Sequence, residues 1–169
     1  MWGSTKANTP DECTWANAPF NNGSISYNST YFNSVKDTVC PNNVLAKKYD
    51  TATQIMGGDW RMPTKAELKE LIDNTNSVWV EDYKGSGVNG RNFTSKKEGY
   101  QDNSIFIPAA GYCFGYDSVG DVGYYGGVWS SSLGPSNSNG AYDLGFGSDY
   151  CGVGYYDRSY GQSVRGVRK

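Results

Sequence analysis

The sequence predicts a mixed α+β domain, on three observations. Short apolar alternations with a period of two residues recur after residue 74, as expected for half-buried strands. Helix caps followed by helical spacing are confined to two short segments between residues 50 and 73. The 22 glycines and 14 tyrosines favour many turns and an aromatic surface over long helices. We therefore expect two short helices, small antiparallel sheets and much irregular structure.

A single domain is expected across residues 1–169, because a chain of this length can bury one sizeable core. Residues 1–48 are polar, rich in Asn and weakly patterned, with candidate strands only near residues 24–32 and 44–47. We expect this N-terminal part to be irregular structure wrapped on the core.

Two helices are predicted from the signals at their ends. Asp50 is placed to cap a helix that runs to about residue 56, where a Gly-Gly pair ends it because glycine accepts the left-handed conformation. Thr64 and Glu67 then form a capping box, and Leu68 and Leu71 follow at helical spacing. The second helix therefore begins directly after Pro63.

Strands are predicted where apolar residues alternate between Gly, Asn, Asp and Ser turns, at residues 78–80, 88–94, 104–107, 127–132, 141–147, 151–155 and 162–167. In the fifth of these, Leu144 and Phe146 share one face, while Asp143, Gly145 and Gly147 share the other. An apolar framework thus alternates with positions that have no packing role, as a replaceable binding surface requires.

Four cysteines permit three disulfide pairings, and the sequence does not choose among them. Cys13 and Cys40 flank a polar segment that a disulfide would stabilise, so this pair is slightly favoured. Cys151 is interpreted as a chance occupant rather than half of a disulfide, and Cys113 has no obvious partner. Because there is no CxxC or Cys/His spacing, neither a zinc site nor any other cofactor is predicted.

Charge and hydropathy exclude several classes of partner. The net charge of −2 gives no electrostatic case for nucleic acid binding. No apolar stretch approaches the roughly 20 residues of a membrane span, and the N-terminus does not resemble a signal peptide. These features suit an excised domain or a mature form. We expect no membrane-spanning segment and a monomer.

The absence of histidine removes the commonest general base and the commonest transition-metal ligand. We therefore predict that the protein is not an enzyme and has no catalytic residues. A glycosidase-like pair of carboxylates is the catalytic alternative that composition leaves open. Asp117 and Asp121 with nearby carbonyls are the alternative for a structural calcium ion, but no dedicated motif supports a metal site.

Residues 137–160 contain only a restricted set of amino-acid types. Each of them can be encoded by changing only the two adenines of an Asn codon, AAC or AAT. Lys, Glu, Gln, Met and Trp, which such codons cannot reach, are missing between Ser130 and Tyr160 but occur elsewhere in the chain. This pattern indicates adenine-directed mutagenesis. The alternative is an ordinary surface loop rich in Gly, Tyr and Ser.

Four segments carry a resemblance to a known family. They read GGDWRMPT at 57–64, SIFIPAAGY at 104–112, VWSSS at 128–132 and GQSVR at 161–165. In this order they resemble the major paralogous domain of fibre-degrading and gut bacteria, over residues 49–168. The resemblance implies a C-type lectin-like fold. Several members of that family are variable proteins of diversity-generating retroelements, and a phage tropism protein shares the fold.

In such retroelements a reverse transcriptase copies a template repeat with errors at adenines and writes it into the 3′ end of the gene. The resemblance therefore implies a hypervariable region at 137–160, before the constant GQSVR segment. Leu144, Phe146, Val153 and Arg158 are expected to be scaffold. The diversified, ligand-binding positions are expected to be Asp143, Gly145, Gly147, Tyr150, Gly152, Gly154, Tyr155, Tyr156, Asp157, Ser159 and Tyr160.

We therefore expect a non-catalytic ligand-binding domain of the receptor or adhesion type, displayed on the bacterial cell surface or, alternatively, on a phage virion. The expected ligand is a protein or surface glycan of another cell. A constant carbohydrate- or matrix-binding module of the same fold is the alternative. Within the motifs, Trp60 and Trp129 are expected in the core, and Arg61 and Arg165 are expected to be internal anchors.

Overall fold

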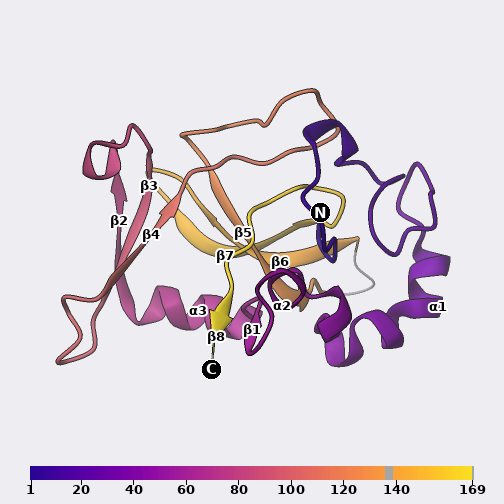
Figure 1. The fold of residues 1–169 in the computed structure, drawn as a ribbon, viewed down its shortest axis with the longest axis horizontal. Helices are drawn as coiled ribbons and strands as arrows, with labels where there is room; N and C mark the ends of the chain where they lie inside the picture. The colour runs from indigo at the N-terminus through magenta and orange to yellow at the C-terminus, as the bar shows by residue number, and fades with distance from the viewer. Residues whose placement is uncertain (136–138, 169) are drawn as a thin grey trace.

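The computed structural model describes residues 1–135 and 139–168 of the chain. In that part it contains three α-helices and three small antiparallel sheets, so the predicted α+β class is confirmed (Figure 1). One sheet has the order β2-β3-β4, a second the order β5-β6-β7, and the strands β1 and β8 pair alone. No helix among these residues is long and apolar enough to cross a membrane.

The two predicted helices are present with their predicted caps. Helix α2 (Thr51–Met56) begins where the side chain of Asp50 accepts a hydrogen bond from the Thr53 amide at 2.9 Å, and it ends at Gly57 with φ 68°. Helix α3 (Lys65–Asp73) begins at the capping box of Thr64 and Glu67. Glu67 also forms an ion pair with Arg61, so Arg61 is the internal anchor that the sequence predicts.

A third helix was not predicted. Helix α1 (Ser29–Val39) begins after Asn28, whose side chain accepts a hydrogen bond from the Tyr31 amide, so the predicted strand at residues 24–32 is wrong. Phe32 and Val39 are buried on one face of the helix. The few apolar residues of this segment have helical spacing, but its Asn, Ser and Thr content concealed that spacing.

Residues 1–48 contribute to the main core. Trp2 is fully buried, and its indole nitrogen donates a hydrogen bond to the carbonyl oxygen of Ser130 at 2.8 Å. The expected strand at residues 44–47 is reduced to an isolated bridge between Val44 and Ser132. The N-terminal part therefore closes over the central sheet with a packed tryptophan and a helix, although its composition is polar.

Most of the predicted strands are present. The β2-β3-β4 sheet joins β2 (Thr75–Val80), β3 (Gly90–Ser95) and β4 (Ser104–Pro108), and the central sheet joins β5 (Gly126–Leu133), β6 (Gly140–Phe146) and β7 (Cys151–Asp157). The strand expected at residues 162–167 is shorter than predicted. Only β8 (Val167–Arg168) forms, and it pairs with β1 (Trp60–Arg61).

The central sheet separates two hydrophobic clusters. Trp129 is fully buried in the first cluster, together with Trp2 and Phe32. Val128 and Leu144 belong to the second cluster, which packs against α3 and the β2-β3-β4 sheet. Because side chains alternate along a strand, β5 supplies Trp129 and Leu133 to the first cluster and Val128 to the second. Figure 1 shows the β2-β3-β4 sheet at one end of the molecule, α1 at the other, and the central sheet between them.

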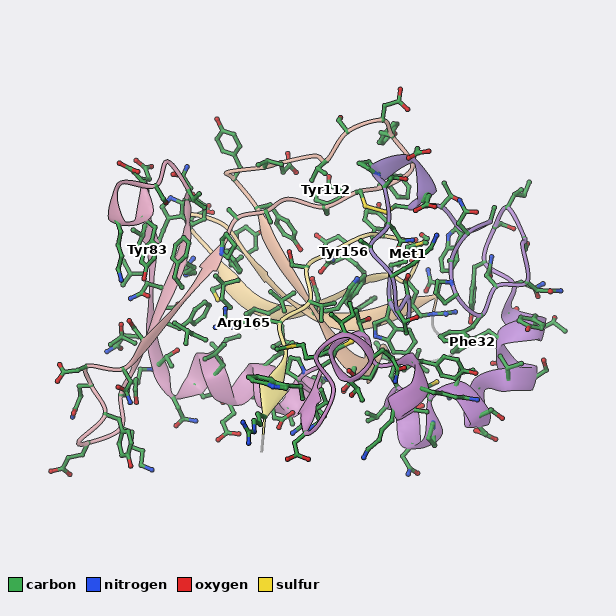
Figure 2. The ribbon with its side chains drawn as sticks, viewed as in Figure 1. Met1, Phe32, Tyr83, Tyr112, Tyr156 and Arg165 are labelled. Carbon is green, nitrogen blue, oxygen red and sulfur yellow. A yellow bond between two sulfur atoms is a disulfide. The ribbon has the colours of Figure 1, made fainter. Side chains whose placement is uncertain are left out.

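Two expectations about motif residues are wrong. Trp60 is half-buried rather than part of the core, because it lies on β1 of the small two-stranded sheet at the surface. Arg165 is exposed and is not an internal anchor. Trp60 pairs with Arg168 of β8, and Arg165 lies in the segment that leads to β8 (Figure 2).

The expected pairing of Cys13 with Cys40 is also wrong. Cys13 forms a disulfide with Cys113, which lies 100 residues further along the chain (Figure 2). Cys40 is a buried thiol directly after α1, and burial raises its pKa. Cys151 is half-buried and takes no part in a disulfide, as expected. The disulfide joins the N-terminal part to the segment at residues 111–125, a contact that sequence spacing does not reveal.

Candidate ligand-binding surface

The predicted hypervariable region spans β6, β7 and the turn after β7, and its residues 137 and 138 lie outside the described residues. Strand register places Leu144 opposite Val153 and Phe146 opposite Cys151 on the face that packs against α3. Leu144 and Phe146 are fully buried and Val153 packs against them, so all three are scaffold as predicted. The other face of the same strands is left for the remaining positions.

Several of the predicted tyrosines reach solvent. Tyr150, Tyr155 and Tyr156 are 49%, 59% and 42% exposed, and Tyr160 is half-buried. Tyr155 and Tyr156 lie on strand β7, and Tyr150 and Tyr160 lie in the turns at its two ends. Because a tyrosine ring has few rotatable bonds, it offers a large contact area at low entropic cost.

Tyr156 and Tyr160 join an aromatic cluster that continues into residues 111–125. We call this cluster the aromatic surface, and it comprises Tyr112, Phe114, Tyr116, Tyr125, Tyr156 and Tyr160. The ring centroids of Phe114 and Tyr160 stack at 4.3 Å, those of Tyr156 and Tyr160 lie 5.7 Å apart, and those of Tyr125 and Tyr156 lie 6.2 Å apart. In Figure 2, Tyr112 lies on the long connection that leads to β5, and Tyr156 lies below it in this view.

Sequence reasoning missed the four rings of this surface that come from residues 111–125. The density of aromatic residues in that segment was a signal that could have indicated it. The segment is held by the Cys113 disulfide and by paired backbone hydrogen bonds between Tyr112 and Gly120. At Gly111 the backbone has φ +72°, and a Cβ there would collide with the Gly120 carbonyl oxygen, so only glycine fits this turn.

Tyr155 does not belong to the aromatic surface. It lies across from Tyr142 on the opposite face of the sheet, with their ring centroids 6.3 Å apart. The ammonium group of Lys65 lies 3.9 Å from the centroid of the Tyr142 ring. Adjacent residues of β7 therefore point to different environments, as strand alternation requires.

The expectation that all the predicted positions project from the scaffold is wrong for Asp143 and Ser159, which are fully buried. Gly145 and Gly147 are buried as well, whereas Gly152, Gly154 and Asp157 are half-buried. For Asp143 and Gly145 the physical reason is a second layer of side chains: Tyr125 and Gln162 lie against Asp143, and Tyr125 lies beside Gly145. This layer covers part of the face that the sequence left open to solvent.

Asp143 and Tyr125 form a buried polar pair beneath the aromatic surface. The Tyr125 hydroxyl donates a hydrogen bond to Oδ2 of Asp143 at 3.3 Å, whereas Oδ1 has no hydrogen-bond partner in the described part of the chain. Burial raises the pKa of Asp143 to about 6, against the opposing effects of the Gln162 amide and the Tyr125 hydroxyl. Burial also raises the pKa of Tyr125, so the phenol stays protonated at neutral pH.

Asp143 should make stability depend on pH. Its pKa rises on folding from an ordinary 3.8 to about 6, so protonation favours the folded state. This stabilisation is complete below the unfolded pKa and is lost as pH rises through 6. Between about pH 7.5 and pH 4.5 we expect the wild type to gain about 2 kcal/mol of unfolding free energy relative to Asp143→Asn.

Urea denaturation of both proteins over this pH range measures the difference. Glu67, whose pKa is lowered to about 2 by its hydrogen bonds to Arg61, titrates below the window and is common to both proteins. Parallel pH profiles for wild type and variant would show that Asp143 is not the group responsible.

Arg158, expected to be scaffold, is fully buried among aromatic rings. The centre of its guanidinium lies 3.9 Å from the centroid of Phe32 and 5.5 to 5.8 Å from those of Tyr27, Trp2 and Trp15. Such a position over ring faces stabilises a desolvated cation. Arg158 therefore ties the end of β7 to the N-terminal part of the chain.

A cavity of about 660 Å³ lies on the other side of the central sheet. Its apolar floor includes Leu68, Ile107 and Leu144, and Arg165 lies at its rim. None of the predicted diversified residues lines it. The cavity is therefore a separate feature from the aromatic surface.

The chemistry of the aromatic surface suits contact. Its exposed groups are ring faces and phenol hydroxyls, which provide apolar area and hydrogen bonds to a partner. Among residues 1–135 and 139–168, no group of three or more Cys, Asp or Glu side chains is placed to hold a metal ion. Comparison of the chain with family models, with curated proteins and with solved structures found no match.

Proposed function

We propose that this domain is a non-catalytic ligand-binding module whose aromatic surface is diversified by a retroelement. The proposal includes a C-type lectin-like fold, with display on a bacterial cell surface or a phage virion. Its ligand is a macromolecule of another cell, bound through the tyrosines of β7 and the following turn. The restricted set of amino-acid types at residues 137–160 and the four family-like motifs support the retroelement part of the proposal.

The arrangement of β6 and β7 is the observation that carries the proposal. Leu144 and Phe146 are fully buried, while Tyr150 and Tyr156 are exposed within the same restricted segment. Substitution of such exposed residues changes stability little, whereas the buried residues hold the backbone in place. A segment of this kind can change its binding specificity without losing its fold.

A fixed backbone also favours binding, because ordering a loop on association costs affinity. The aromatic surface is held on one side by the β6–β7 ladder and on the other by the Cys13–Cys113 disulfide. The alternative function is a constant carbohydrate- or matrix-binding module. Exposed rings such as Phe114 and Tyr116 support it, since aromatic faces also stack on sugars.

The DNA flanking the gene tests the retroelement. We expect a near-identical template repeat nearby, with adenines in the template wherever the two copies differ, and an adjacent reverse transcriptase gene. The codons of Tyr150, Tyr156 and Tyr160 should be among the differing positions. The codons of Leu144 and Phe146 should be identical in both copies, because their side chains are fully buried.

Differences spread evenly over the four bases, or a complete genome without such a repeat, would leave the constant binding module as the better explanation. Differences at adenines that fall equally on the buried and the exposed codons would contradict the division of β6 and β7 into scaffold and binding residues.

A further inference from the structure

We propose that the aromatic surface recognises an organic cation, namely the ammonium or guanidinium group of a lysine or arginine side chain on a basic partner protein. This inference rests on the proposed function and names the chemistry of its ligand. Three independent features of the described residues support it: the carboxylates around the tyrosines, the exposed ring faces, and a buried carboxylate oxygen that lacks a partner.

Carboxylates act electrostatically on the tyrosines in and beside the aromatic surface. Apart from burial, the pKa of Tyr112 is raised chiefly by Asp121, and that of Tyr160 chiefly by Asp157. The neighbouring Tyr150 is affected in the same way by Asp149 and Asp143, after burial and the phenol of Tyr156. The titratable groups that act on these three hydroxyls are therefore all carboxylates or other phenols, and none of them is a cation. An incoming cation would be attracted and an incoming carboxylate repelled.

The rings provide faces for the same kind of group. Tyr156 is 42% exposed, and its ring lies between those of Tyr125 and Tyr160 at centroid distances of 6.2 Å and 5.7 Å. These neighbours are inclined to the Tyr156 ring at 68° and 52°, so their faces do not all point the same way. Several ring faces meeting around one position can surround a cation, which the negative faces of aromatic rings attract.

Asp143 provides an unsatisfied charge under this position. Its side chain is fully buried and Oδ1 has no hydrogen-bond partner among the described residues, which is costly for a carboxylate unless a positive group compensates it. A Cβ on Gly154 would lie 3.3 Å from this oxygen, and a Cβ on Gly152 would meet nothing within 4 Å. Gly152 and Gly154 therefore place no side chain on this face of β7, which they share with Tyr156. Because Asp143 is fully buried, its charge acts on a ligand at the surface through space rather than by contact.

The nearby arginine does not neutralise this surface. Arg91 donates hydrogen bonds to the carbonyl oxygens of Gly147 and Tyr150 at 2.6 Å and 2.7 Å, and so anchors the turn between β6 and β7. On the far side of the sheet, Lys65 lies over Tyr142. Arg91 and Lys65 thus make backbone and ring contacts outside the aromatic surface. The buried guanidinium of Arg158 acts on Asp157, so the exposed carboxylates of Asp121 and Asp149 are the ones that remain available to a ligand.

A random peptide library displayed on phage tests the proposal. The library is panned against the immobilised domain at low salt, and the enriched peptides are synthesised and titrated against four proteins: wild type, Tyr156→Asn, Asp143→Asn and Tyr155→Asn. Tyr155→Asn is the matched control, because this exposed tyrosine adjoins Tyr156 in sequence but points to the opposite face. Thermal melting of each variant checks that it is folded.

We expect the enriched peptides to be rich in Lys and Arg. Their affinity should fall about tenfold or more in Tyr156→Asn, because a contacting aromatic ring is lost, and remain within about twofold in Tyr155→Asn. It should fall about threefold or more in Asp143→Asn, and in the wild type it should weaken as salt is raised. Below about pH 6 the wild type should lose affinity, while Asp143→Asn should change less.

The two proposals fail in different ways. Enrichment of neutral or acidic peptides whose binding depends on Tyr156 would overturn cation recognition and leave the binding surface standing. Basic peptides that bind all four proteins equally would show nonspecific attraction and would also overturn it. If no enriched peptide depends on Tyr156, both cation recognition and the binding role of the aromatic surface are wrong.

Discussion

Replacing Trp129 by Ala is expected to lower the free energy of unfolding by about 3–5 kcal/mol, as large-to-small changes of buried aromatic residues do. Trp129 is fully buried in the cluster that joins the central sheet to Trp2 and Phe32. Its removal would leave a cavity at the point where the N-terminal part of the chain contacts the sheet. Urea denaturation, with midpoints and slopes compared to wild type, measures the effect.

Tyr155→Asn and Tyr156→Asn are the matched controls, and each should change stability by no more than about 0.5 kcal/mol, because both side chains are exposed. Trp60→Ala should have an intermediate effect, since Trp60 is only half-buried. Equal losses from Trp129→Ala and from the two tyrosine variants would mean that β7 is part of the core on both faces. The proposed binding surface would then be incompatible with the fold.

Loss of the Cys13–Cys113 disulfide is expected to cost about 2–5 kcal/mol. The disulfide closes a loop with a sequence separation of 100, and a loop of this size strongly restricts the unfolded chain in an oxidising environment. Cys113→Ser should therefore melt well below wild type. Cys151→Ser is the control, because this thiol takes no part in the disulfide.

Thermal unfolding with and without a reductant measures the contribution, and peptide mapping under non-reducing conditions identifies the linked cysteines. Reduction should destabilise the wild type but leave Cys113→Ser unchanged. A map that links Cys13 to Cys40 would contradict the structure and restore the pairing favoured from the sequence. In that case residues 111–125 would lose the covalent link that holds their part of the aromatic surface.

Local signals in the sequence predicted the elements that depend on local interactions. Asp50 and Thr64 cap their helices as expected, because a cap is formed within a few residues of the chain. The alternation of β6 likewise identified Leu144 and Phe146 as buried scaffold. Helix α1 was missed because its packing face is short and lies in a polar segment, so its stability depends on tertiary contacts.

What the sequence by itself determined is the α+β class, the two capped helices, most strands and the tyrosines of β7 as candidate binding residues. Only the tertiary structure decided that Cys13 meets Cys113, that Tyr112 and Phe114 join the tyrosines, and that Asp143 is covered. Each of these results depends on residues far apart in the chain. Helix caps predict where a helix begins and ends, and the spacing of apolar residues predicts which face of an element a residue occupies. Which other segment covers that face is set by how the whole chain packs.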